Sequence, residues 1–260
     1  MADADIENKG TVTPFLSVVV PAYDEVNRIG SSLTRMMEYL DAQDYSYEIL
    51  IVDDGSTDGT LDLVKRLSSD HDQVHHHHYD GNRGKGYAVR YGMLRAAGSH
   101  VLFSDADLAT PIEEVEHLLE AIQKGADVAI GSRDVAGSKL EKRQSAFREF
   151  GGKVFNRLVQ LMAVPGIHDT QCGFKLFTSA TCQNIFSRCQ VDNFSFDVEL
   201  LYIARQLGYK IAEVPIRWHH VDGSKVDYYR DTIRMVKTLF RIRVTDYQIK
   251  TAENSRRPAH

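Results

Sequence analysis

Short apolar runs and amphipathic segments alternate along the first half of the chain. The run FLSVVV at residues 15–20, closed by Pro21, is typical of a buried strand. The segment from Ile29 to Leu40 carries apolar side chains at helical spacing, and EILIV at residues 48–52 predicts a second strand. A strand, a helix and a strand in this order form one βαβ unit, which implies parallel strands.

The same rhythm continues as far as residue 132. Helices are predicted over 60–67, 86–97 and 112–124, and strands near Val74, over 100–105 and over 126–132. We expect the histidines at 75–78 to lie on an edge or surface strand. The pattern predicts an α/β fold with a doubly wound, Rossmann-like, mainly parallel sheet flanked by helices, whose ligands collect at the carboxyl ends of the strands.

Beyond Arg133 the pattern loosens, and no low-complexity linker divides the chain. We expect a flexible N-terminus over residues 1–13, one domain over 14–246 and a flexible tail over 247–260. The donor half of this domain would span about 14–133 and the acceptor half about 134–246. Two C-terminal segments, 150–167 and 232–244, alternate apolar residues with Arg and Lys, and such amphipathic helices either lie at a membrane interface or pack on the core.

Composition and charge narrow the class of protein. With 260 residues, 43% of them hydrophobic and 26% charged, the chain is ordinary for a globular protein, and its net charge of −5 gives no reason to expect nucleic acid as a partner. Three cysteines without a CxxC pair argue against a disulfide framework and a structural zinc site. The acidic N-terminus does not resemble a signal peptide, and no apolar stretch reaches the roughly 18 residues of a membrane span, so we expect a cytoplasmic protein with at most peripheral membrane contact.

Acidic residues come directly after three of the predicted strands. They are Asp24 and Glu25, then Asp53 and Asp54, then Asp105 and Asp107. Carboxylates crowded at one sheet edge repel one another unless a cation or ligand donors lie between them, which predicts a polar, metal-bearing site. Two carboxylates two residues apart can present oxygen to one Mg²⁺ or Mn²⁺.

A glycine-rich turn, GNRGKGYAVRYG at residues 81–92, lies between the second and third acidic ends. With Arg83 and Lys85 opening a helix, it predicts a phosphate cradle of backbone amides. Its spacing fits neither the P-loop nor GxGxxG, which excludes a Walker ATPase and a dinucleotide-dependent dehydrogenase.

Taken in order, several blocks resemble the inverting family-2 glycosyltransferases of the GT-A fold. The blocks are VVVPAYDE, IVDDGSTDGT, GNRGKGYAVRYG, SDADLATP, IGSR, HDTQCGFKLF, FSFDVELLYIARQLGY and VPIRW. Within that family they look like the polyprenyl-phosphate (dolichyl-phosphate) transferases, and DTQCGFKLF and FDVELLYIA look especially like the β-glucosyltransferases rather than the related mannosyltransferases. The resemblance runs from about Leu16 to about Val244.

The resemblance implies a role for individual residues. Base and ribose of the nucleotide sugar would be held by Pro21, Tyr23, Glu25 and Asp54, and the metal and diphosphate by Asp105, Ala106 and Asp107. Arg133 would meet the donor phosphates or the acceptor, Lys85 the donor, and Asp169 would lie near the reacting centre. For the acceptor phosphate we expect Arg148, Ser224 and Lys225, the last two in the place where the family carries a phosphate-contacting Ser-Lys.

The implied activity is metal-dependent, inverting transfer of a hexose to a polyprenyl phosphate in the membrane. The mannosyl enzymes have Gln where this chain has Ala109, which favours UDP-glucose over GDP-mannose as donor. A phosphate acceptor is already anionic and needs no strong base, whereas a soluble hydroxyl acceptor would make Asp169 or Asp197 the base. A GDP-mannose donor, a soluble acceptor and a non-catalytic nucleotide-sugar-binding module stay open as alternatives.

Overall fold

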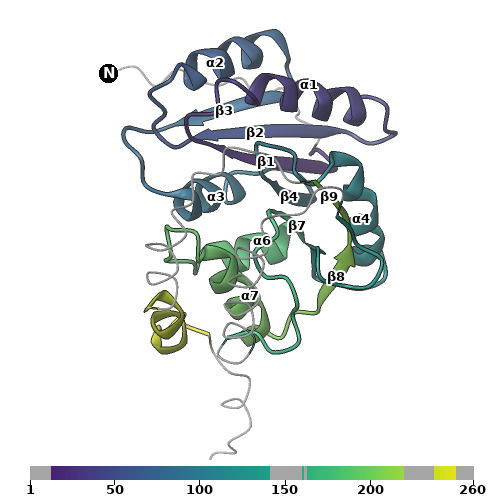
Figure 1. The fold of residues 1–260 in the computed structure, drawn as a ribbon, viewed down its shortest axis with the longest axis vertical. Helices are drawn as coiled ribbons and strands as arrows, with labels where there is room; N and C mark the ends of the chain where they lie inside the picture. Colours follow the sequence, from purple (N-terminus) through teal and green to yellow (C-terminus); the bar gives the residue numbers. More distant parts are fainter. Residues whose placement is uncertain (1–12, 141–159, 161–162, 220–236, 250–260) are drawn as a thin grey trace, which may run out of the picture.

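A seven-stranded sheet with helices on both faces forms the body of the molecule (Figure 1). The computed structural model describes residues 13–140, 160, 163–219 and 237–249. The elements of the first half are β1 (Leu16–Ala22), α1 (Ile29–Leu40), β2 (Tyr47–Asp53), α2 (Thr60–Asp70), β3 (Val74–His78), α3 (Lys85–Met93), β4 (His100–Ser104), η1 (Ile112–Glu114), α4 (Val115–Gln123) and β5 (Val128–Ser132). Those of the second half are β6 (Lys139–Leu140), β7 (Phe174–Thr178), α6 (Ser179–Phe186), α7 (Phe196–Gln206), β8 (Ile211–Pro215) and β9 (Arg217–Trp218).

Strand order brings chemically different parts of the chain to one edge. The order is β3-β2-β1-β4-β7-β5-β8, and β7 runs antiparallel to both of its neighbours while the other pairs are parallel. The predicted mainly parallel sheet is therefore confirmed. Because β7 is reversed, its amino end lies beside the carboxyl ends of β4 and β5, so the residues before Phe174 join those that follow the parallel strands.

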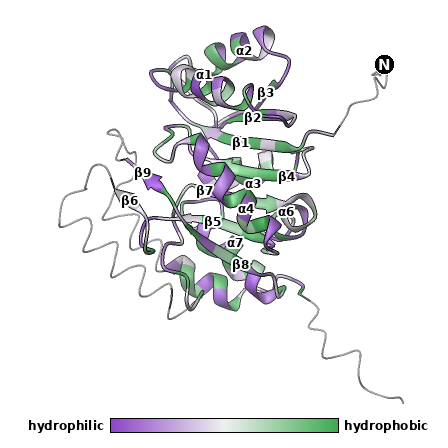
Figure 2. Cartoon of the chain, turned by 90° about the vertical axis from the view of Figure 1, so that its right-hand side faces the viewer, coloured by the Kyte–Doolittle hydropathy of each residue, from purple (hydrophilic) through white to green (hydrophobic). Residues whose placement is uncertain are grey.

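Alternate residues of each central strand enter different cores. Val19, Val52 and Phe103 pack with α3, α6 and α7, whereas Val18 and Leu102 pack with α1 and α4 on the opposite face. Strands buried on both faces need nearly continuous apolar runs, as in FLSVVV and EILIV. Their polar residues, Ser17 and Glu48, are buried and hydrogen-bonded to each other. Figure 2 shows the central strands mostly in the apolar colour, with the short β9 strongly polar.

Most predicted elements are found, and α3 shows why one boundary differs. The helix predicted over 86–97 ends at Met93. Just beyond it, the Ala97 amide donates to Oε1 of Glu48 at 2.7 Å and the Gly98 amide donates to the Ser17 hydroxyl at 2.7 Å. These bonds turn the chain into β4, so the helix cannot continue.

Two other predictions concern the helix over 112–124 and the histidines at 75–78. The helix predicted over 112–124 opens with the 3-10 turn η1 before α4 begins. The four histidines form β3, an outermost strand of the sheet with mostly exposed side chains, as expected. All three cysteines are free and buried.

The folded domain extends beyond its predicted end at residue 246. Residues 237–244 are helical, and Leu239 and Ile242 from this helix lie in the core with α7. Tyr247 is 5% exposed and its hydroxyl donates to Oε1 of Glu199 at 3.0 Å. The expected start of a flexible tail at residue 247 was therefore wrong for Tyr247, because an aromatic side chain with a buried hydrogen-bond partner is held in the core.

Possible membrane-associated helices are only partly covered by the structure. Of the segment 150–167, only residues 160 and 163–167 are described, so its helix stays a prediction. In the described ranges no helix is long and apolar enough to span a bilayer.

Glu199 is a buried carboxylate on which three chain segments converge. It is 0% exposed and also accepts the amides of Gln190 at 3.0 Å and Val191 at 2.9 Å. We predict that Glu199→Gln lowers the free energy of unfolding by about 1–3 kcal/mol, because the amide nitrogen would face donors. Tyr247→Phe, which removes one of these bonds, should lower the free energy of unfolding by about 1 kcal/mol. Urea unfolding of the wild type and both variants measures these differences. Equal stability of wild type and Glu199→Gln would contradict this role.

Candidate active site

The loop after β1 is tied to the loop after β2 by side-chain caps. The Asp24 amide donates to the Ser56 hydroxyl at 2.9 Å, and Asp24 Oδ1 in turn accepts the Thr57 amide at 2.8 Å. One residue on, the Glu25 amide donates to the Thr60 hydroxyl at 2.7 Å. The residues predicted to bind the nucleotide, Pro21, Tyr23 and Glu25, thus lie on a segment that hydrogen bonds from the loop after β2 hold in place.

Glu25 is paired with an arginine that the sequence analysis did not single out. The Arg28 guanidinium bonds both carboxylate oxygens of Glu25, with Nη2 at 2.7 Å from Oε1. Hydrogen bonding to Glu25 raises the pKa of Arg28, and the charges of Asp107 and Asp105 raise it further. Arg28 therefore adds positive charge beside the predicted metal ligands. The three-residue spacing of Glu25 and Arg28 was the available signal.

Asp54 and the glycine-rich turn bind each other. Asp54 is 3% exposed, and its carboxylate accepts the amides of Arg83 at 2.7 Å and Gly84 at 2.9 Å. Beyond Lys85, the amides of Gly86 and Tyr87 donate to the carbonyl oxygen of Asp192. Four amides of the predicted phosphate cradle therefore have partners within the chain. Asp54 accordingly anchors the start of α3, and its contact with base or ribose stays a prediction.

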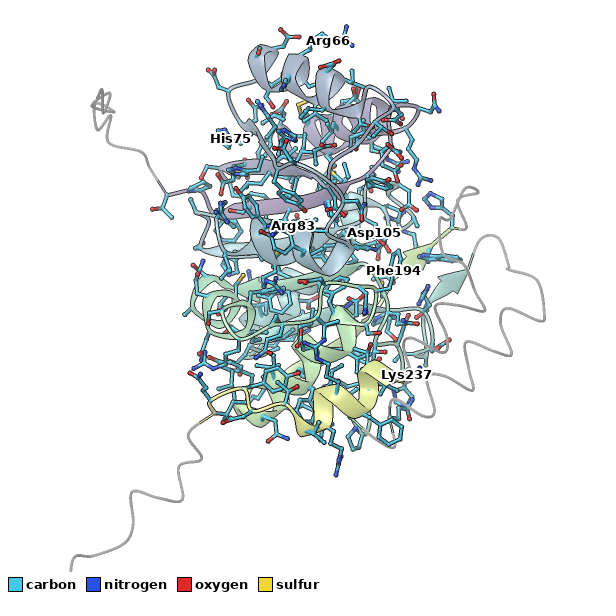
Figure 3. The ribbon with its side chains drawn as sticks, turned by 90° about the vertical axis from the view of Figure 1, so that its left-hand side faces the viewer. Arg66, His75, Arg83, Asp105, Phe194 and Lys237 are labelled. Atoms are coloured by element: carbon cyan, nitrogen blue, oxygen red, sulfur yellow. The ribbon has the colours of Figure 1, made fainter. Side chains whose placement is uncertain are left out.

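Asp105 lies under Lys85 at the carboxyl end of β4. The Lys85 ammonium is 2.6 Å from Oδ1 of Asp105 and lies near the rings of Phe103 and Phe194, at 5.5 and 6.0 Å from their centroids. Figure 3 shows Asp105 and Phe194 close together on the same side of the molecule. Helix α3 thus projects its first residue, Lys85, onto the predicted metal ligand.

Asp107 follows on the same loop, and Ala106 between the two carboxylates is buried. Oδ1 of Asp107 accepts the Ala109 amide at 3.1 Å. Burial raises the pKa of Asp107, and the nearby negative charge of Asp105 raises it further. Two hard oxygen donors that repel each other fit a divalent ion. Within the described residues, no group of three or more His, Cys, Asp or Glu side chains is placed to hold a metal ion.

Arg133, just after β5, and the buried Asp169, before β7, form a bidentate pair. Nε and Nη2 of Arg133 lie 2.7 and 2.9 Å from the two oxygens of Asp169, and the Arg133 amide adds a third bond at 3.0 Å. Burial alone would raise the pKa of Asp169, but the Arg133 charge and its hydrogen bonds hold it below the usual range. Asp169 therefore orients Arg133 and is poorly suited to accept a proton.

A short segment after β8 joins this pair to the carboxylate loop. Trp218 in β9 packs against Arg133, whose guanidinium carbon is 5.4 Å from the ring centroid. On either side of it, Arg217 pairs with the buried Glu114 and the His219 amide donates to the Ala109 carbonyl at 2.9 Å. The Asp105–Asp107 loop and Arg133 are consequently held in one framework.

A second charge pair lies beneath Lys85, and the sequence analysis missed half of it. Lys175, fully buried in β7, donates to Oδ1 of Asp197 and to the Cys172 carbonyl, both at 2.5 Å. A lysine inside the apolar run GFKLF was the signal, because a buried ammonium requires a carboxylate partner. Asp53 was also overlooked as a separate feature: it is 0% exposed, and among the described residues its Oδ1 has no hydrogen-bond partner.

Of the predicted acceptor-phosphate residues, Arg148, Ser224 and Lys225 lie outside the described residues. Among the residues predicted for the donor, the metal and the reacting centre, the structure brings six together on one sheet edge: Glu25, Lys85, Asp105, Asp107, Arg133 and Asp169.

A mainly parallel α/β sheet with acidic strand ends beside fixed arginine and lysine side chains places this protein among the α/β proteins whose ligand site lies at the carboxyl ends of the strands. Residues 17–186 match the sequence model of Glycosyl transferase family 2, and the chain belongs to this family. It is 40% identical to a dolichyl-phosphate beta-glucosyltransferase of Dictyostelium discoideum over 92% of this chain and 77% of the relative. It is 39% identical to the enzyme of that name from Saccharomyces cerevisiae, over 88% and 74%.

Solved structures agree on the fold. Glucosyl-3-phosphoglycerate synthase from Mycobacterium tuberculosis in complex with UDP superposes with a TM-score of 0.64 at 18% identity, covering 94% of this chain and 83% of that one. A mannosyltransferase from Pyrobaculum calidifontis with GDP-Man and Mn²⁺ gives 0.57 at 21% identity, covering 89% and 64%. The predicted GT-A fold is confirmed.

The Arg133 and Asp169 pair yields a pH-dependent prediction. Asp169→Asn should lower the free energy of unfolding at neutral pH by about 1–3 kcal/mol, because it leaves the partly buried Arg133 guanidinium without its counter-charge. Since the pKa of Asp169 is lowered by folding, this stabilisation is complete above the ordinary carboxyl pKa of about 4 and is lost as the pH falls below it. Urea unfolding of both proteins between pH 7 and pH 3 measures the difference, and a gap that widened on acidification would contradict the assignment.

Proposed function

We propose that the chain transfers glucose from UDP-glucose to a dolichyl-type polyprenyl phosphate, with inversion at the anomeric carbon. The observation that carries this proposal is the placement of Asp105 and Asp107 beside Lys85, with the paired Arg133 held against the same loop. Such an edge suits a diphosphate leaving group on one side and an anionic acceptor on the other. The names of the sequence relatives support glucose as the sugar and dolichyl phosphate as the acceptor.

Several features favour UDP-glucose as donor. The neighbour bound to UDP and the neighbour bound to GDP-Man share the fold with this chain, so the fold does not decide the nucleotide. The sequence relatives are glucosyltransferases, and Ala109 offers no side-chain ligand where the mannosyl enzymes have Gln. GDP-mannose remains the competing donor.

Asp105 and Asp107 would hold a Mg²⁺ or Mn²⁺ ion together with the donor diphosphate. When bound, the ion would neutralise the charge that develops on the leaving nucleoside diphosphate. Arg28 and Lys85 lie beside the two carboxylates and contribute positive charge to the same region. Arg133, fixed by Asp169, would orient a phosphate of the donor or the acceptor by its planar guanidinium.

A phosphate acceptor agrees with the state of the possible bases. Asp169 is saturated by Arg133, and Asp197 is 5% exposed and bonded to Lys175. Neither carboxylate is placed to take a proton from a hydroxyl group. An acceptor phosphate is anionic at neutral pH, so attack in line with the leaving group requires positioning and no base. This reasoning disfavours a soluble hydroxyl acceptor.

The activity is tested by transfer of labelled sugar from UDP-glucose, UDP-galactose or GDP-mannose to a short polyprenyl phosphate in detergent. With Mg²⁺ or Mn²⁺, we expect organic-extractable label from UDP-glucose. Asp107→Asn should lower this rate about 100-fold or more, because the charge on the leaving group is no longer neutralised. Lys124→Met, in an exposed pair with Glu120, is the matched control and should keep wild-type activity.

Other outcomes of this assay identify the alternatives. Lipid-linked label from GDP-mannose alone would make the protein a mannosyltransferase. Binding of the nucleotide sugar without a lipid product would favour a soluble acceptor, and a protein without any transfer to lipid or soluble acceptors would be a binding module.

We also propose peripheral contact with the cytoplasmic face of a membrane through the helix at residues 237–244. Phe240 and Val244, one helical turn apart, are 59% and 82% exposed and are the large exposed hydrophobics within the described ranges. Lys237 and Arg241 on the same helix are also exposed (Figure 3 labels Lys237). Apolar side chains flanked by cations suit the boundary of an anionic bilayer.

This surface can be tested by sedimentation with vesicles that contain anionic lipid. We predict that replacing Phe240 and Val244 together by Ser lowers vesicle binding by about tenfold or more, because both side chains lose apolar area to bury. Lys124→Ser is the control for a distant surface change. Equal binding of the double variant and wild type would contradict the proposal, whatever the outcome of the sugar-transfer assay.

A further inference from the structure

The Asp105 carboxylate has one oxygen against the backbone and the other beneath a lysine. Oδ2 lies so close to Gly173 that a Cβ at that position would overlap it, and the Asp105 amide donates to the Gly173 carbonyl at 3.0 Å. Oδ1 is buried, with the Lys85 ammonium 2.6 Å away. A divalent ion that binds this buried oxygen would therefore compete with the Lys85 ammonium for it.

Lys85 has a second carboxylate within reach of its charge. Burial disfavours the charged ammonium, but Asp105 and then Asp197 raise the pKa of Lys85. Asp197 is bonded to Lys175, so it keeps its place whether or not Lys85 stays on Asp105. The Lys85 side chain is 25% exposed, and its ammonium lies 5.5 and 6.0 Å from the ring centroids of Phe103 and Phe194, whose faces attract a cation.

We propose that Lys85 is a built-in counter-cation that occupies the metal position on Asp105 until the divalent ion and the donor diphosphate arrive together. This inference rests on the proposed use of a metal-bound nucleotide sugar. The ion displaces the ammonium from Oδ1, because two cations on one oxygen repel each other. The diphosphate then supplies the negative charge that Lys85 has lost.

The exchange makes metal and nucleotide binding mutually dependent. Without nucleotide, a divalent ion competes with Lys85 and binds weakly. With a diphosphate present, the displaced ammonium gains a partner and the same ion binds tightly. By linkage, the ion raises the affinity for the nucleotide by the same factor.

Mn²⁺ titration followed by electron paramagnetic resonance tests this exchange without any sugar transfer. In nucleotide-free protein, Lys85→Met should bind Mn²⁺ about tenfold or more tightly than wild type, because the ammonium that competes for Asp105 is gone. A cation beside a carboxylate lowers its affinity for a proton by about one to three decades, and we expect an effect of at least the lower size on a divalent ion. Lys85→Arg retains the cation and should stay near wild type, as should the surface control Lys124→Met. When UDP is added, the gain in Mn²⁺ affinity should be smaller in Lys85→Met than in wild type.

Lys85→Gln is measured beside Lys85→Met, and thermal unfolding establishes that each variant is folded. Unchanged or weaker Mn²⁺ binding by both folded variants would overturn the exchange. Unaltered Mn²⁺ binding by Asp105→Asn would overturn it as well, because the shared oxygen would then not be a ligand. A protein that shows the expected Mn²⁺ pattern but transfers no glucose would keep this inference while refuting the proposed function.

Discussion

The organisation of this edge of the sheet depends on the neutralisation of buried and partly buried carboxylates. Parallel strands deliver acidic residues to a single edge, and their repulsion would open that edge if each charge were not balanced. Glu25 is balanced by Arg28 on the same loop. The other partners lie on a different segment of the chain: Asp54 with the amides of the glycine-rich turn, Asp105 with Lys85, Asp169 with Arg133, and Asp197 with Lys175. Because these four contacts join separate segments, the charge balance also positions the loops.

The sheet was largely predictable because its central strands are buried on both faces. Such strands appear as uninterrupted apolar runs, and helix α1 was predicted with its observed bounds because its apolar residues recur at helical spacing. The reversal of β7 was not predictable, since direction in a sheet is a long-range property. The early end of α3 follows from bonds to Ser17 and Glu48, which are far away in the sequence.

The site was predictable in type and less so in its partners. The positions of Asp105 and Asp107 after a buried strand were enough to predict their common edge. The sequence does not show which donor a carboxylate will take, and Asp54 illustrates this: its neighbours along the chain suggest a ligand contact, but the fold brings the amides of Arg83 and Gly84 to it. The pairing of Lys175 with Asp197 likewise depends on β7 meeting α7.

The pairing of Asp169 with Arg133 bears on the kind of acceptor that this edge can serve. The Arg133 charge holds the pKa of Asp169 below its usual range, so this carboxylate binds a proton weakly, because protonation would break its ion pair. Asp169 in its guanidinium clamp therefore contributes rigidity at the cost of basicity. A transferase that activates a hydroxyl group needs the opposite compromise, a carboxylate left free enough to take a proton. An anionic acceptor needs no such base. It needs cations held in fixed positions to bind it, and this fold provides fixed cations beside its acidic strand ends.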